Sequence, residues 1–140
     1  MTQTRIYLPM TPDDVRRLAT EREVGPSPLR AYAVTQRLER SHAPDLLEEE
    51  LEYAALTEAV ERAAGLQGNR VTKRVVAAAD VDPAWVRGAE DDGLAAVEVT
   101  HAVPLRLVVS FHVDETAGDQ GLDDLLWYDA TELDEVLRLV

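Results

Sequence analysis

Short segments in which apolar and polar residues alternate constrain this chain more than any other feature. In residues 5–10, Ile6, Leu8 and Met10 share one phase, while Arg5 and Tyr7 share the other. Because successive side chains of a β-strand point to opposite faces, this pattern predicts a strand with one apolar and one polar face. Strands are predicted in the same way at residues 29–35, 71–81, 94–101 and 106–114. We therefore expect a five-stranded sheet whose apolar face packs on a core.

Helix signals separate the predicted strands. Thr11 offers an N-cap oxygen and Pro12 suits the first helical position, so a short helix is expected to begin there. Thr35 is expected to cap a second short helix, and Asp45 to open the longest helix, which runs to about residue 64. A Thr-x-x-Asp pattern at residues 131–134 predicts the start of a last helix.

The resulting order β-α-β-α-β-β-β-α predicts the class of fold. It fits an α+β two-layer sandwich, in which a mixed five-stranded sheet carries helices mainly on one face, with the ferredoxin-like arrangement as the nearest scheme. A crossover through the first helix predicts that the first two strands are parallel. The short link around Pro104 predicts that the last two are antiparallel, and the three alanines at 77–79 would let a helix approach closely.

Length, charge and cysteine usage bound the kind of protein. The 140 residues are expected to form one domain, residues 1–140. A net charge of −13 should repel duplex nucleic acid and favours basic partners, although it also serves solubility alone. The absence of cysteine excludes disulfides, thiolate catalysis and Cys-ligated zinc, and suits the cytoplasm. No secretory leader is expected, and the longest apolar run, residues 75–79, is too short to cross a membrane.

The polar phase of the predicted strands is the candidate site. Its members are Arg5, Tyr7, Arg30, Tyr32, Arg74, Ser110 and His112. Arg and Tyr are enriched in protein interfaces, so a face of this composition predicts binding of a protein partner, or of a second copy of the chain, if helices leave it open. An ordinary polar outer face is the plainer alternative. Stacking of single-stranded RNA is disfavoured by the charge and by the missing glycine-aromatic signature.

An enzyme is the competing hypothesis. Ser110, His112 and Asp114 alternate along one predicted strand and, with Asp80, could centre a hydrolase or a metal-dependent activity. However, residues two apart on a strand are about 6.5–7 Å apart at Cα, whereas a nucleophile and its base need about 2.6–3.2 Å. No histidine spacing typical of zinc occurs. No catalytic residue, metal ligand or cofactor is therefore predicted, and the small acidic protein is expected to be an adaptor or regulator.

Several short segments together resemble a known family. They are Arg5-Ile-Tyr-Leu-Pro, Ala31-Tyr-Ala-Val-Thr35, Glu50-Leu-Glu-Tyr-Ala54, His112-Val-Asp-Glu115 and Leu126-Trp-Tyr-Asp129. In combination they resemble an actinobacterial family of uncharacterised proteins, a domain of unknown function. The resemblance spans most of the chain and implies cytosolic residence. It implies no activity, cofactor or catalytic residue.

Overall fold

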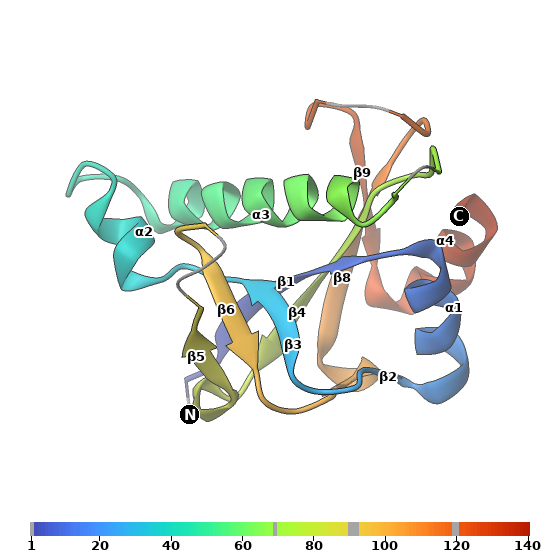
Figure 1. Ribbon diagram of the computed structural model, residues 1–140, viewed down its shortest axis with the longest axis horizontal. Helices are drawn as coiled ribbons and strands as arrows, with labels where there is room; N and C mark the ends of the chain where they lie inside the picture. Colours follow the sequence, from blue (N-terminus) through green and yellow to red (C-terminus); the bar gives the residue numbers. More distant parts are fainter. Residues whose placement is uncertain (1, 69, 90–92, 119–120) are drawn as a thin grey trace.

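The computed structural model describes residues 2–68, 70–89, 93–118 and 121–140 of the chain (Figure 1). Its main feature is a seven-stranded sheet in the order β5-β6-β3-β1-β4-β8-β9, beside a two-stranded ribbon of β2 and β7. The strands are β1 (Thr4–Met10), β2 (Glu23–Val24), β3 (Leu29–Tyr32), β4 (Val75–Val81), β5 (Val86–Gly88), β6 (Ala96–Val99), β7 (Val103–Pro104), β8 (Val108–Asp114) and β9 (Leu125–Asp129). The helices are α1 (Pro12–Glu21), α2 (Gln36–Arg40), α3 (Glu48–Gly65) and α4 (Leu133–Leu139), with 3-10 turns at Pro83–Trp85, Leu105–Leu107 and Ala130–Glu132.

The first two helices begin where capping residues place them. The Thr11 hydroxyl accepts a hydrogen bond from the Asp14 amide at 3.1 Å, and the Asp14 carboxylate accepts one from the Thr11 amide at 2.9 Å. This reciprocal capping box satisfies two amides that the helix cannot pair internally. Thr35 caps α2 through the Leu38 amide at 3.0 Å. The long helix begins at Glu48 rather than at the expected Asp45.

Two apolar clusters lie on opposite faces of the sheet. On one face, the even phase of β1 packs with Val15 and Leu18 of α1 and with Leu133 and Val136 of α4. On the other face, Ala55, Ala59, Val60 and Ala63 of α3 pack against the sheet, on a cluster that includes Tyr7, Tyr32, Val76 and Ala78. Figure 1 shows α3 lying along the sheet, away from the neighbouring α1 and α4. The helices therefore cover both faces, whereas the sequence predicted them mainly on one.

The α+β sandwich predicted from the sequence is confirmed, but several details of the sheet are not. The sheet has seven strands instead of five, a larger arrangement than the four-stranded ferredoxin-like scheme. It is not mixed, because every pairing within the described residues is antiparallel. The first two predicted strands, β1 and β3, are antiparallel since the connection through α1 and β2 starts and ends at the same end of the sheet. The last two, β6 and β8, are not neighbours: β6 pairs with β3 and β5, and β8 with β4 and β9.

Two strands of the seven-stranded sheet, β5 and β9, were not predicted from the sequence. The three residues of β5 are too few to show alternation. The sequence of β9 is Leu-Leu-Trp-Tyr-Asp, in which apolar and polar residues do not alternate. Both strands lie at the edges of the sheet, where short or irregular segments are tolerated. Within the part of the chain that the structure describes, no helix is long and apolar enough to span a bilayer.

Candidate functional site

A groove opens on the α3 face of the sheet. It has a volume of about 280 Å³ and lies between the first half of α3 and side chains of β1, β8 and β9. Its lining residues are Arg5, Tyr7, Glu49, Glu52, Tyr53, Leu56, Ser110, His112 and Trp127. The groove therefore brings together four of the residues that the sequence selected, Arg5, Tyr7, Ser110 and His112.

The floor of the groove is built from cross-strand neighbours. Arg5 of β1 lies opposite Asp80 of β4, and its guanidinium donates to both carboxylate oxygens, from Nε at 2.6 Å and from Nη2 at 3.1 Å. This bidentate pair raises the pKa of Arg5, chiefly through the hydrogen bond to Asp80. Because Asp80 compensates its charge, Arg5 adds little net positive charge to the floor.

Two titratable groups next to Arg5, Tyr7 and His112, are neutral at pH 7. Burial raises the pKa of Tyr7, the carboxylate of Glu52 raises it further, and Arg5 partly offsets both effects. Burial lowers the pKa of His112, and the nearby charge of Arg5 lowers it further, so the imidazole is uncharged at neutral pH. The floor of the groove thus presents neutral polar groups.

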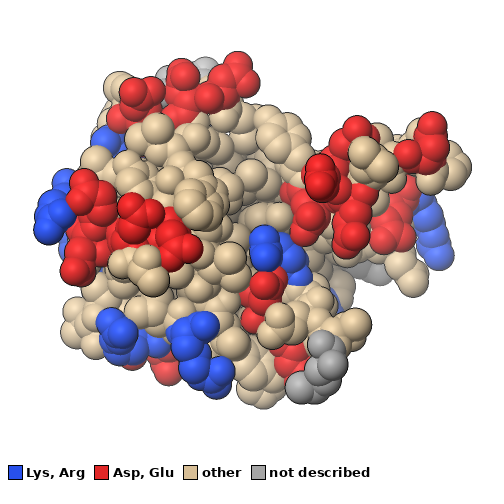
Figure 2. Space-filling model, turned by 180° about the vertical axis from the view of Figure 1, so that it is seen from behind, with Lys and Arg blue, Asp and Glu red and all other residues tan. Residues whose placement is uncertain are grey.

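Two large aromatic side chains stand exposed in the lining of the groove. Tyr53 of α3 is 54% exposed, and Trp127 of the edge strand β9 is 59% exposed. Trp127 lies opposite His112 in the β8–β9 register. The α3 side also carries the carboxylates of Glu49 and Glu52. Figure 2 shows Asp and Glu gathered over the end of the molecule formed by α2 and the start of α3.

Three of the selected residues lie outside the groove. Tyr32 faces Tyr7 in the β1–β3 register, and both are buried in the cluster under α3. Arg30 is half-buried and lies opposite Glu98 of β6. Arg74 is buried and donates to both oxygens of Asp114, each at 2.8 Å. The prediction of an open Arg/Tyr sheet face is therefore wrong, because α3 covers its tyrosines and Asp114 neutralises Arg74.

The residues proposed for an enzyme do not converge either. Asp114 is buried and forms an ion pair with Arg74. Its carboxylate also accepts a hydrogen bond from the Arg74 backbone amide at 2.6 Å. Among the described residues, no hydrogen bond joins Ser110, His112 and Asp114, and no three His, Asp or Glu side chains are placed to hold a metal ion. The geometry gives no support to a triad or a metal centre at His112.

Trp85 is a packed loop residue. Its ring stacks on His101, with 4.7 Å between the ring centroids, and it lies against the apolar cluster of the α1 face. Trp127, in contrast, is exposed and lines the groove. The sequence did not select Trp127 as a site residue, because its neighbours Leu126 and Tyr128 show no alternation of apolar and polar residues.

The fold and the groove define an α+β sandwich protein with an acidic, aromatic-lined surface site. The chain belongs to a family of unknown function, DUF6912, whose family model matches residues 4–137. The predicted resemblance to an uncharacterised family is thereby confirmed. Neither the curated proteins nor the solved structures contain a match to this chain.

Proposed function

We propose that this protein is a cytoplasmic protein-binding adaptor or regulator, and that its groove takes a basic segment of a partner protein. The observation that carries the proposal is the pair of exposed aromatic side chains, Tyr53 and Trp127, in one groove with two carboxylates. Trp and Tyr are the residues that most often dominate the binding energy of an interface. The absence of cysteine supports a reducing compartment.

Charge complementarity supports a basic occupant. Glu49 and Glu52 add two negative charges to the lining, while the charge of Arg5 is offset by Asp80 and His112 is neutral. A Lys or Arg side chain between the aromatic rings would gain a cation–π interaction of about 0.5–1 kcal/mol at an exposed site. The net charge of −13 would also speed the encounter with a positively charged partner.

The groove replaces the wider sheet face as the proposed binding surface. Of the residues selected from the sequence, Arg5 and His112 remain half-exposed at its floor, whereas Tyr7 and Ser110 are buried and would contribute shape rather than contacts. A second copy of the chain is a weaker candidate than a basic partner, because both copies would bring the same negative charge.

Selection from a random peptide display library tests the proposal. The parent protein is the bait, and the double variant Tyr53→Ala/Trp127→Ala is used for counter-selection. We expect enriched peptides to carry Arg or Lys. Loss of Trp127 alone should weaken their binding by roughly 30-fold, the effect of an interface hot spot. Fluorescence anisotropy with labelled peptides measures the affinities.

Charge-matched variants separate the groove from the general acidity of the protein. Glu49→Gln/Glu52→Gln should weaken binding, whereas Glu50→Gln/Glu61→Gln removes the same charge from exposed positions of α3 outside the groove lining and should not. Peptides that bind both double glutamine variants equally, or enriched peptides without basic residues, would show that the proposed function is wrong.

A further inference from the structure

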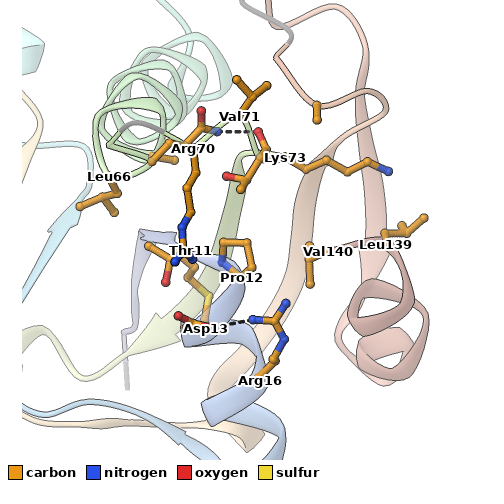
Figure 3. Close-up of a pocket in the computed structure, with 15 residues that line it drawn as sticks. Thr11, Pro12, Asp13, Arg16, Leu66, Arg70, Val71, Lys73, Leu139 and Val140 are labelled. Atoms are coloured by element: carbon orange, nitrogen blue, oxygen red, sulfur yellow. Dashed lines mark hydrogen bonds and ion pairs between the residues drawn. The ribbon is translucent and has the colours of Figure 1, made fainter.

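A second and larger cavity lies away from the groove. It has a volume of about 490 Å³ and is enclosed by the start of α1, the end of α3, the segment 66–73 and the last residues of α4 (Figure 3). None of its lining residues lines the groove. The role of this cavity therefore has to be explained independently of the proposed binding of a basic peptide.

The cavity is basic in an otherwise acidic protein. Arg16, Arg70 and Lys73 line it, and Asp13 is the one acidic side chain in the lining, although the whole chain has 27 acidic and 14 basic residues. Asp13 accepts a hydrogen bond from Arg16 at 2.5 Å, which offsets that one charge. Arg70 and Lys73 form no ion pair with any residue that the structure describes. Two positive charges thus remain available at the cavity.

The same cavity holds a hydroxyl without a partner. Thr72 contributes to the lining, and its buried Oγ1 has no hydrogen-bond partner among the described residues. Its backbone carbonyl, in contrast, accepts a bond from Gln67 Nε2 at 2.7 Å, which fixes the segment next to the end of α3. A buried polar atom is normally paired, but this oxygen is shut off from solvent, so it is not a contact that a molecule in the cavity can reach.

The rest of the lining is aliphatic. Met10, Leu66, Val71 and Leu139 supply apolar surface, and no aromatic ring that could stack on a nucleobase is present in the lining. Figure 3 shows Arg70 reaching into the cavity toward Thr11 and Pro12, while Arg16 and Lys73 lie on other sides of it. The arrangement suits a small anionic molecule with an aliphatic body.

We infer that this cavity binds a small aliphatic dianion, either a phosphate monoester or a dicarboxylate. Two uncompensated cations match a charge of −2, and the Arg70 guanidinium can donate two parallel hydrogen bonds to a phosphate or carboxylate group. Lys73 adds a second positive charge at the cavity. The aliphatic side chains of the lining can pack against the body of the ligand.

Isothermal titration calorimetry with two probes tests the inference and distinguishes the sources of the dianion. Glycerol 3-phosphate represents the phosphate monoesters and succinate the dicarboxylates, with neutral glycerol as the blank. We expect saturable binding of at least one dianion and none of glycerol. Arg70→Gln and Lys73→Gln should each weaken that binding about tenfold or more, since each removes a charge-assisted hydrogen bond.

Arg106→Gln is the matched control, because Arg106 is exposed and does not line the cavity, and the substitution changes the net charge by the same amount. It should leave the affinity unchanged. Thermal unfolding of all three variants in the absence of probe should coincide with that of the parent, since these side chains hold no ion pair among the described residues. The inference is overturned if neither dianion binds saturably, or if Arg106→Gln weakens binding as much as the cavity variants.

Discussion

At the scale of single residues, the Arg74–Asp114 pair is the most consequential contact of the polar sheet face. Arg74 is 5% and Asp114 1% exposed, and four hydrogen bonds join them. The Asp114 carboxylate accepts three, one of them from the Arg74 backbone amide, and the Asp114 amide donates to the Arg74 carbonyl at 3.1 Å. The Nη2 of Arg74, which donates to Asp114, also donates to the Gly121 carbonyl at 2.5 Å. The pair therefore fixes the start of β4 against the end of β8 and the loop beyond it.

Asp114→Ala should destabilise the protein by about 3–5 kcal/mol, because it leaves a buried guanidinium without its counter-charge. Urea unfolding monitored by circular dichroism measures the change. Asp13→Ala, which removes the partner of Arg16 in an exposed pair, is the control and should cost about 0–1 kcal/mol. Equal losses in both variants would contradict the structural role of the buried pair.

His112 predicts a pH dependence of stability. Its pKa is lowered in the folded state by burial and by Arg5, so the unfolded chain binds a proton more readily. The free energy of unfolding should therefore fall as the pH drops through the unfolded value near 6.5, and the loss should level off below the lower folded pKa.

Unfolding curves at pH 5.5 and 7.5 reveal this contribution when the parent is compared with His112→Asn. The carboxylates titrate in both proteins, so the difference between the two slopes isolates the histidine. A variant that keeps the full loss of stability between these pH values would show that His112 is not the responsible group.

Residue patterns predicted the composition of the site better than its exposure. Alternation correctly placed Arg5, Tyr7, Ser110 and His112 on one face, because a strand has a fixed period. It could not show that a helix covers Tyr7 or that Arg74 is paired, since both depend on segments distant in the sequence. Tyr53 was not predicted as a site residue, and only the structure shows that it is exposed beside the groove.

At the scale of elements, the contact between α3 and β4 is made of very small side chains. Ala78 of β4 and the α3 residues Ala55, Ala59 and Ala63 are all buried in the same cluster. The sequence predicted that the alanines at 77–79 would let a helix approach closely, and α3 does pack on this strand. This close contact holds α3 in position beside the groove.

Ala59→Leu should therefore destabilise the protein by about 1–3 kcal/mol, because the packed contact has no room for three more carbon atoms. Ala64→Leu makes the same change at an exposed position of the same helix and should leave stability nearly unaltered. Chemical unfolding of both variants provides the measurement. A neutral Ala59→Leu would indicate that α3 is loosely packed.

At the scale of the whole molecule, the charge is uneven: the protein is acidic, but one cavity is lined mainly by basic side chains. Acidic side chains gather at the α2–α3 end and at other places on the face shown in Figure 2, while Arg16, Arg70 and Lys73 line the cavity between α1, α3 and α4. The composition alone gives the net negative charge of the protein. It does not show that basic side chains gather at one cavity, because that depends on the fold. Strand order was not readable, because the antiparallel pairing depends on partners far apart along the chain.

The position of β1 between β3 and β4 has a consequence for how fast the chain can fold. Arg5 and Asp80 are neighbours across strands although 75 residues separate them in sequence. Closing so long a loop costs entropy before any of the strand pairs on that side can form, and proteins dominated by such distant pairings fold in milliseconds to seconds. We therefore expect the pairing of β1 with β4, in the middle of the sheet, to form late in folding.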